Sequence, residues 1–297
     1  MKAITTLGHG EIEFSELPVP VPSAGEVLVR VTAATVNPID TVFRAGALHS
    51  VGVISHDRPI GLGWDVAGQV EQVGAEVTAF AVGDLVAGLV PAFDVPLGGL
   101  AEFALLPADA LAGVPAGLDD VHATALTLNA LTAQQAIPLL GDAAGRSLLV
   151  TGAAGAVGGF ALELLAGQDW EISGLARESD ADFVSARGAK LVTDLSATYD
   201  VVFDAAALQE QALAAVRPGG HFVGVQTSMP LEATEGRTVT AVGVVPDGSG
   251  LRELLGRAAA GDLTVRVAGT VPFADAGQAF DQVAAGSNRG RWVVVHD

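Results

Sequence analysis

The chain has 297 residues, enough for two domains of ordinary size, and half of its residues are hydrophobic, so it can bury a substantial core. Its formal net charge of -19 would repel nucleic-acid phosphates and anionic membranes, so neither is an expected partner. The absence of cysteine excludes disulfides, thiolate zinc sites and a cysteine nucleophile. The sequence shows no signal-peptide pattern and no apolar run of about 20 residues, from which we expect a cytoplasmic protein.

The first part of the chain, up to about residue 119, is rich in predicted strands. Short β-branched or alternating runs are separated by Gly, Pro, Asn and Asp, a spacing that indicates a sandwich or a partly open barrel. These runs are Met1–Thr5, Val27–Ala33, Gly68–Val73, Leu85–Val90 and Ala101–Leu106.

From about Asp119 onward, strands alternate with helices, which predicts a parallel sheet with crossover connections. An alanine- and leucine-rich helix, Asp119–Leu140, precedes the first buried strand, Ser147–Thr151. Pro218-Gly219-Gly220 is expected to stop one of the later helices. Further strands are expected at 171–175, 190–192, 201–203, 221–225 and 238–245, with helices at 157–166, 180–187, 209–216 and 251–260. A tail of strand 265–271, helix 273–285 and strand 291–295 follows.

A glycine turn lies between the strand 147–151 and the next helix, in the segment Leu148–Gly158. The pattern G-x-x-G-x-x-G lets the chain turn tightly, approach a phosphate without a Cβ in the way and pack the helix close to the strand. The helix N-terminus then supplies N–H groups for a pyrophosphate. A plain turn without a ligand is the alternative. The expected cofactor-binding residues are Gly152, Ala153, Ala154, Gly155, Ala156, Val157 and Gly158.

The end of the next strand bears on the choice between NADH and NADPH. Sites for NAD usually place an acid there to bind the ribose 2′-hydroxyl, but this chain has Ala176 followed by Arg177. Arginine suits a 2′-phosphate, so the sequence favours NADPH, with Arg177 and Ser179 as binding residues. The other interpretation is that Glu178 is the ribose acid and Arg177 a solvated charge.

Several short segments, in order over almost the whole chain, resemble the medium-chain dehydrogenase/reductase superfamily, in its zinc-independent quinone oxidoreductase branch. The segments beside the glycine turn are Asn37-Pro38-Ile39-Asp40, Gly63-Trp64-Asp65-Val66-Ala67-Gly68, Val73-Gly74, Gly83-Asp84, Gly98-Gly99-Leu100-Ala101-Glu102-Phe103, Leu131-Thr132-Ala133, Arg217-Pro218-Gly219-Gly220 and Asn288-Arg289-Gly290-Arg291.

The resemblance implies an α/β protein with a GroES-like β domain and a Rossmann doubly wound parallel sheet, the C-terminal tail returning to the first domain. The implied division is a catalytic domain at 1–119, a Rossmann NADP-binding domain at 120–262 and the returning tail at 263–297. An active site in the cleft between the domains and a homodimer or higher homo-oligomer would follow.

The resemblance also implies site residues. Asn37 and Asp40 would lie near the nicotinamide and the substrate as the catalytic pair, Asn37 donating to a carbonyl oxygen and Asp40 orienting its neighbours. A turn is the structural alternative for Asn37-Pro38. Phe43 and Trp64 would be apolar walls for a planar substrate, although Trp64 equally suits core packing. The remaining implied cofactor contacts are Thr132 (or a helix-packing threonine), Gly224, Val225, Gln226 and Arg289 (or a surface charge).

Two departures from the family are visible. The Gly-His-Glu segment of its zinc alcohol dehydrogenases is Gly63-Trp64-Asp65 here, and two scattered carboxylates, Asp40 and Asp65, make a poor zinc site, so no metal is expected. In addition, residues 194–200 run almost directly into the next strand, so the Rossmann domain lacks its usual helix and is trimmed at one edge.

These observations lead to the hypothesis of an NADPH-dependent, zinc-independent oxidoreductase that transfers hydride to a quinone or an activated alkene. Such acceptors need little help from an acid, which fits a site poor in proton donors. An NADPH-binding sensor or structural protein with little catalysis is one alternative. An enoyl-thioester reductase is another, weakened because the single tyrosine, Tyr199, lies outside the N-terminal half. An alcohol dehydrogenase would require a metal.

Overall fold

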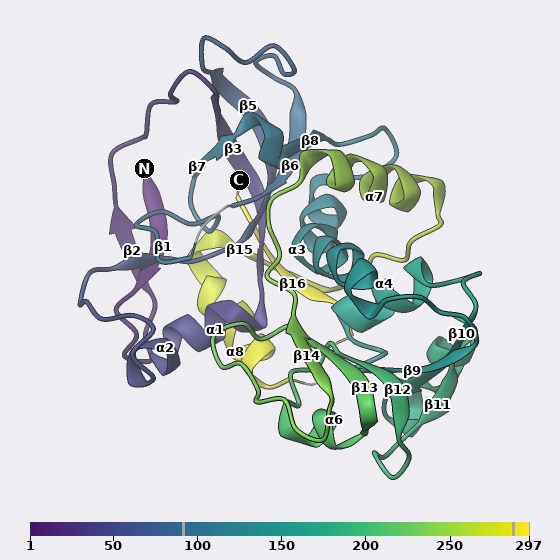
Figure 1. Ribbon diagram of the computed structural model, residues 1–297. Coiled ribbons are helices and arrows are strands. Elements are labelled where there is room, and N and C mark those ends of the chain that lie inside the picture. Colours follow the sequence, from purple (N-terminus) through teal and green to yellow (C-terminus); the bar gives the residue numbers. More distant parts are fainter. Residues whose placement is uncertain (91–92, 287–288, 297) are drawn as a thin grey trace. The chain divides into compact units, whose positions relative to one another are not determined.

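The computed structural model describes residues 1–90, 93–286 and 289–296, and these form two compact units (Figure 1). Unit 1 comprises Met1–Leu128 and Val245–Asp297, and unit 2 comprises Asn129–Val244. The chain passes from unit 1 into unit 2 within one helix, α3 (Asp120–Ala136). Helix α7 (Gly248–Ala260), which the sequence analysis grouped with the dinucleotide-binding part, falls in unit 1. The functional division at 119 and 262 stays a prediction, and Asn288 lies outside the described residues.

Unit 1 is built on a seven-stranded sheet with the order β15-β16-β3-β5-β6-β8, in which β7 also pairs with β3. A smaller sheet has the order β2-β1-β4. Three strands that the sequence analysis did not find, β2, β4 and β8, are only two to four residues long, too short to show a periodic pattern. The strands are β1 (Lys2–Thr6), β2 (Glu13–Glu16), β3 (Glu26–Val36), β4 (Ile60–Gly61), β5 (Asp65–Val73), β6 (Leu85–Leu89), β7 (Phe103–Pro107), β8 (Leu111–Gly113), β15 (Val267–Pro272) and β16 (Arg291–Val295).

Strand β3 organises this unit because it pairs with β5, β7 and β16. Its apolar residues alternate toward a core that includes Ile4, Val29 and Phe43. Strand β16 runs antiparallel to β3, with Trp292 opposite Val36, so the end of the chain adds a strand to the N-terminal sheet, as expected. Helix α8 (Ala276–Ala284) packs on β15 and β16. Two short helices, α1 (Pro38–Arg44) and α2 (Ala47–Ser50), follow β3.

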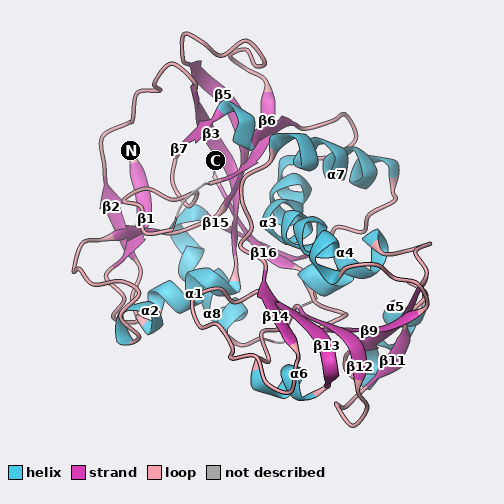
Figure 2. Ribbon diagram, in the orientation of Figure 1, coloured by secondary structure: helices cyan, strands magenta, loops and turns pink. Residues whose placement is uncertain are grey.

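Unit 2 is a six-stranded parallel sheet with helices between its strands (Figure 2). The strand order is β11-β10-β9-β12-β13-β14, so the direction of winding reverses between β9 and β12, which is where open parallel sheets bind ligands. The strands are β9 (Arg146–Thr151), β10 (Trp170–Leu175), β11 (Lys190–Val192), β12 (Tyr199–Asp204), β13 (Val216–Gly224) and β14 (Thr238–Ala241), and the helices are α4 (Ala156–Leu164), α5 (Ala181–Ser185) and α6 (Glu210–Ala214).

The connection from β11 to β12 is short, as the trimmed edge predicted. Residues 193–198 have no helix and yet cross two intervening strands to reach β12. Leu195, half-buried in this segment, packs against a cluster of buried residues that includes Leu149, Val202 and Phe222. One leucine therefore covers part of a sheet face that a crossover helix would otherwise cover.

The segment around Pro218 differs from the expectation. The sequence analysis placed Val216 at the end of a helix stopped by Pro218-Gly219-Gly220, but α6 ends at Ala214 and β13 begins at Val216. Val216 pairs with Tyr199, and the register then shifts so that His221 pairs with Val201. The extra residues form an irregularity in which Pro218 needs no ladder hydrogen bond and Gly219 takes a φ of 74°.

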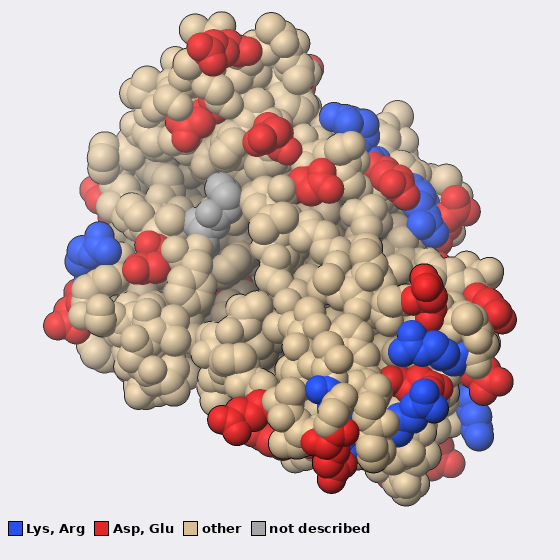
Figure 3. All heavy atoms as spheres, in the orientation of Figure 1, with Lys and Arg blue, Asp and Glu red and all other residues tan. Residues whose placement is uncertain are grey.

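The acidic surface forms no single patch on the face shown in Figure 3, where Asp and Glu side chains are scattered. Scattered charges of this kind favour solvation. Within the described ranges, the helices are all too short or too polar to cross a membrane.

Candidate functional site

The glycine turn in unit 2 has the geometry that a phosphate cradle requires. Gly152 follows β9 with a φ of 56°, a left-handed conformation that glycine adopts without strain. A Cβ on Gly158 would lie 2.3 Å from the Gly152 carbonyl oxygen, so only glycine allows α4 to start this close to the turn. A Cβ on Gly155 would meet only the carbonyl group of Gly152, with the oxygen at 2.9 Å and the carbon at 3.9 Å. Gly152 is thus required for its backbone conformation and Gly158 for packing, while Gly155 leaves room for a ligand.

The backbone N–H groups of this turn divide into two sets. Those of Ala153 and Gly155 donate within the protein, to the carbonyls of Leu175 and Gly152 at 3.1 and 2.7 Å. Ala156 and Val157 are half-buried and begin α4, where N–H groups have no intrahelical acceptor. A helix N-terminus also carries partial positive charge. Ala156 and Val157 are therefore the residues whose N–H groups could hold a pyrophosphate, while Ala153 and Ala154 are buried around the turn.

The end of β10 leaves both interpretations of cofactor choice open. Ala176 donates its N–H to Val192 and so continues the sheet. Arg177, Glu178 and Ser179 are all exposed, so the cation and the acid are equally accessible to a ribose or its phosphate.

The other expected cofactor residues lie at several places. Gly224 is buried at the end of β13, paired with Asp204 and Ala241, and Val225 and Gln226 follow it half-buried. Thr132 is buried on α3, and Arg289 is half-buried before β16. Thr132 falls in unit 2 and Arg289 in unit 1.

Asp204, which the sequence places at the end of a strand without a catalytic role, holds the loop after β12. Its Oδ1 accepts from the Thr151 hydroxyl at 2.6 Å and its Oδ2 from the Gln209 N–H at 2.8 Å. Both oxygens are thus used inside unit 2.

Asn37 and Asp40, expected as the catalytic pair, are both buried at the start of α1. Asp40 accepts from the backbone N–H of Asn37 at 2.8 Å and of Gly63 at 2.7 Å. The side-chain amide of Asn37 donates to the Asp65 carboxylate at 2.7 Å and to the Thr35 hydroxyl at 3.0 Å. Both contacts hold the Asn37 amide inside this buried network.

Asp65 is the centre of this buried network. Besides Asn37, its carboxylate accepts from the Thr35 hydroxyl and from the N–H of Leu128 on α3. Burial raises the pKa of Asp40 to about 7, and the charge of Asp65 adds to this effect. Burial also raises the pKa of Asp65 to about 6, against the lowering effect of its hydrogen bonds and of Arg291. Burial lowers the pKa of Arg291 to about 10.

Three features of this network were not predicted from the sequence: the part played by Thr35, the central position of Asp65 and the influence of Arg291 on it. A signal for Thr35 was present, because it is a polar residue in the apolar run that ends β3. Arg291 belongs to the closing family segment, but nothing in the sequence links it to Asp65, 226 positions earlier.

The residues present do not fit a zinc ion. All four carboxylate oxygens of Asp40 and Asp65 accept hydrogen bonds from protein donors, and the position of a ligand histidine holds Trp64. In the part of the chain that the structure describes, no group of three or more His, Cys, Asp or Glu side chains could hold a metal ion.

Phe43 and Trp64, the expected substrate walls, lie together in unit 1. Their ring centroids are 6.4 Å apart, and a third ring, Phe93, packs edge-on against Phe43 at 5.3 Å. Phe43 is buried and Trp64 half-buried, so Phe43 also serves the core. Phe93 is 45% exposed and was missed because it lies in a loop without periodic pattern.

Comparisons with known proteins define the family. Residues 23–116 match the alcohol dehydrogenase GroES-like domain, and residues 178–294 match the zinc-binding dehydrogenase family. The chain is 32% identical over 244 residues to 2-methylene-furan-3-one reductase of Solanum lycopersicum, which covers 75% of this chain and 61% of that protein. It is 31% identical over 246 residues to the chloroplastic NADPH-dependent alkenal/one oxidoreductase of Arabidopsis thaliana, covering 76% and 62%.

The solved structure of an alcohol dehydrogenase superfamily protein from Novosphingobium aromaticivorans matches the whole chain. The TM-score is 0.84 at 27% identity, and the match covers 100% of both chains. The chain belongs to the medium-chain dehydrogenase/reductase superfamily, with a GroES-like domain and a Rossmann-like parallel sheet. Its matched relatives are oxidoreductases, although the chain spans only about three fifths of the length of the two plant proteins.

Proposed function

We propose that this protein is an NADPH-dependent, zinc-independent reductase of quinones or activated alkenes. The observation that carries the proposal is the saturation of the two buried acids, whose four oxygens all accept hydrogen bonds from the protein. Neither acid offers a free carboxylate oxygen to a metal ion or a substrate in this arrangement. A substrate that accepts hydride readily, and takes its final proton from solvent, suits such a site best. The activities named for the two plant relatives, on an alkenal or enone and on a furanone, support this substrate class.

In this proposal the bound nicotinamide supplies the hydride, and the chain's own residues hold the partners in place. The N–H groups of Ala156 and Val157 bind the pyrophosphate, with Gly155 leaving room for it. Trp64, half-buried beside the buried ring of Phe43, provides an apolar surface for the acceptor ring and excludes water from it. Asn37 fixes the backbone between β3 and α1 through Asp65, and so acts as a positioning residue.

The test of the function is a panel of acceptors assayed with NADPH. We expect oxidation of NADPH in the presence of naphthoquinone or an α,β-unsaturated ketone, and none with a saturated ketone. The rate should survive dialysis against a strong chelator. NADPH binding without turnover of any quinone or enone would refute the reductase and favour a cofactor-binding protein with little catalysis.

The choice of NADPH rests on Arg177, and a charge-matched pair of variants tests it. A charge-assisted contact from Arg to phosphate is worth about 1.5–3 kcal/mol, so Arg177→Ala should weaken NADPH binding about 10- to 100-fold and leave NADH unchanged. The control is Arg252→Ala, which removes the same charge from the exposed side of α7. Tighter binding of NADH than NADPH by the unmodified protein would overturn the assignment and point to Glu178.

The proposal includes a homodimer or higher homo-oligomer acting in the cytoplasm, both drawn from the family resemblance. Light scattering after size-exclusion chromatography tests the first. A mass equal to one chain of 29.9 kDa at working concentration would refute it.

A further inference from the structure

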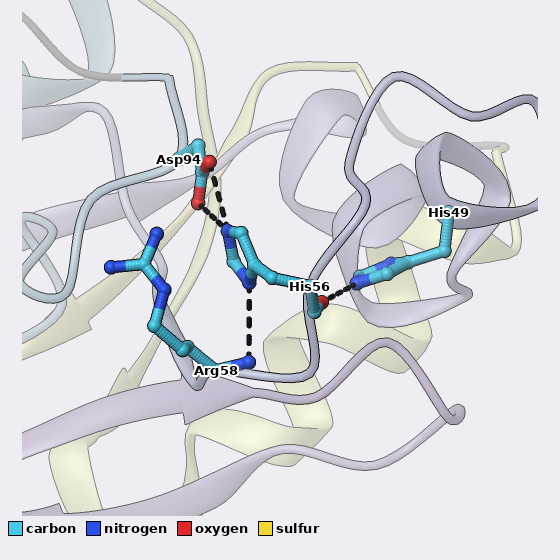
Figure 4. Close-up of polar contacts among 4 residues, drawn as sticks. All are labelled: His49, His56, Arg58 and Asp94. Atoms are coloured by element: carbon cyan, nitrogen blue, oxygen red, sulfur yellow. Dashed lines mark hydrogen bonds and ion pairs between the residues drawn. The ribbon is translucent and has the colours of Figure 1, made fainter.

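A histidine–aspartate pair joins two loops of unit 1 beside the aromatic residues. His56 points its Nε2 between the two carboxylate oxygens of Asp94, at 2.8 and 2.9 Å (Figure 4). The side chains are only 24% and 31% exposed. The two residues are 38 positions apart, so the pair ties the loop before β4 to the loop that follows β6.

The orientation of His56 is fixed from both sides. Its Nδ1 accepts the backbone N–H of Arg58 at 3.1 Å, and because an amide can only donate, the proton of the neutral ring lies on Nε2, facing Asp94. The carbonyl of His56 accepts from Nε2 of His49 on α2 at 3.2 Å. Figure 4 shows these contacts as one chain running from α2 through His56 to Asp94. His56 is thus held in a single rotamer and tautomer.

Because His56 holds Asp94 in place, it also limits where the preceding residue, Phe93, can lie. The φ of 63° at Asp94 is a left-handed conformation that costs a non-glycine residue energy and needs support from its surroundings. The two contacts from His56 supply this support. The preceding residue, Phe93, packs on Phe43, which in turn lies beside Trp64. An exposed aromatic side chain on a loop would otherwise be free to turn into solvent.

We propose that His56 is a positioning residue for the substrate: through Asp94 it holds Phe93 against the buried Phe43, so that Phe93 and the half-buried Trp64, both packed on Phe43, present aromatic side chains to a planar, conjugated acceptor. This inference rests on the proposed function for the identity of the substrate. It adds a determinant of specificity, because a flat ring gains from contact with aromatic side chains and a short acyclic enone does not. We call the three rings the aromatic wall.

The test compares His56→Ala with His56→Gln in the full chain. Glutamine keeps an N–H donor near the position of Nε2 and can still reach Asp94, whereas alanine cannot. The control is His122→Ala, which breaks a second histidine–aspartate pair, His122 with Asp119 at 2.6 Å, at the exposed start of α3. Steady-state kinetics are measured with naphthoquinone and with methyl vinyl ketone. Equilibrium binding of naphthoquinone is followed by quenching of tryptophan fluorescence, with Trp64→Phe identifying the signal of Trp64.

We expect His56→Ala to raise the KM and the dissociation constant for naphthoquinone about 3- to 10-fold, the range that loss of one aromatic contact gives. The value of kcat, the NADPH affinity and the KM for methyl vinyl ketone should stay within about twofold. His56→Gln should restore most of the affinity, and His122→Ala should behave as the unmodified protein.

Equal naphthoquinone binding by the unmodified protein and His56→Ala would overturn the inference, whatever the activity. An equal rise in KM for both acceptors, unrescued by glutamine, would also overturn it, because it would show a general structural effect. If the protein reduces no acceptor but naphthoquinone still binds, and binds more weakly to His56→Ala, the proposed function would be refuted and the role of the aromatic wall in binding would be supported.

Discussion

The first turn of α4 has no space for a methyl group at Gly158. In Gly158→Ala the added Cβ would lie 2.3 Å from the carbonyl oxygen of Gly152, 2.8 Å from its carbonyl carbon and 3.0 Å from Cα of Ala153. Relaxed carbon–oxygen contacts are about 3.3–3.6 Å, so the helix and the turn must separate by about 1 Å. All three neighbours are backbone atoms, which cannot rotate away as a flexible side chain could.

Overpacking of this kind costs about 1–3 kcal/mol, and we expect Gly158→Ala to lose about 2 kcal/mol of unfolding free energy. The N–H groups of Ala156 and Val157 move with the helix, so the dissociation constant for NADPH should also rise, by about tenfold or more. Urea unfolding followed by circular dichroism measures the first effect, and titration calorimetry measures the second.

Two other glycines make the test specific. Gly256→Ala places a methyl group in α7 with nothing within 4 Å, so it should gain about 0.5–1 kcal/mol of stability and leave NADPH binding unchanged. Gly155→Ala meets only the carbonyl group of Gly152, so it should weaken binding more than it weakens the fold. Unchanged stability and unchanged NADPH affinity in Gly158→Ala would refute the cradle as we describe it.

Three further outcomes follow from the structure. Asp40 and Asp65 have raised pKa values, so the folded protein holds protons that the unfolded chain has released; their contribution to stability is complete below about pH 4 and is lost as the pH rises toward 6 for Asp65 and 7 for Asp40. The unfolding free energy should therefore fall between about pH 4 and pH 7 in urea titrations, and fall less in Asp40→Asn; a rise over this range would contradict the pKa assignment. Asp204→Ala leaves the donors of Thr151 and Gln209 unpaired and should cost about 2–4 kcal/mol, with an unchanged unfolding midpoint as the contrary result. Leu195→Ala should cost about 1–2 kcal/mol in the same assay because this half-buried side chain covers the sheet where a helix is missing, and no loss would mean that the segment 193–198 does not protect the sheet.

The fold was predictable where the sequence repeats a pattern over several residues. Strand β9, the glycine turn and α4 form such a stretch, and the tail strand Arg291–Val295 has the bounds that the sequence analysis expected. The absence of a crossover helix between β11 and β12 was also predictable, because the six residues between these strands are too few to form one and its connections. The β13 irregularity was not, since Pro218 and two glycines normally end a helix, and only pairing with β12 shows that they interrupt a strand.

For the candidate site, the sequence predicted residues that lie within one short motif, but not the contacts between residues from distant segments. The family motifs drew attention to Asn37, Asp40 and Trp64, each within a short run of recognisable residues. They could not show that the Asn37 amide donates to Asp65, because that contact joins the end of β3 to the start of β5. The His56–Asp94 pair was equally hidden. Both residues lie in loops, which have no periodic hydrophobic pattern. Nothing in the sequence therefore indicates that these two loops lie close together in the fold.

The hydrogen bonds of Asn37 explain why a substrate that needs little acid assistance suits this protein. The side-chain amide of Asn37 donates to Asp65 and to Thr35 within the buried network. Asp65 would be a costly buried charge without these donors, so freeing Asn37 for a substrate oxygen would leave the carboxylate short of a partner. The same argument applies to Asp40, whose oxygens hold two backbone N–H groups in place. The polar network therefore fixes the backbone at the end of β3, and the electrophilicity of the acceptor, rather than a proton donor in this network, has to drive the reaction that we propose.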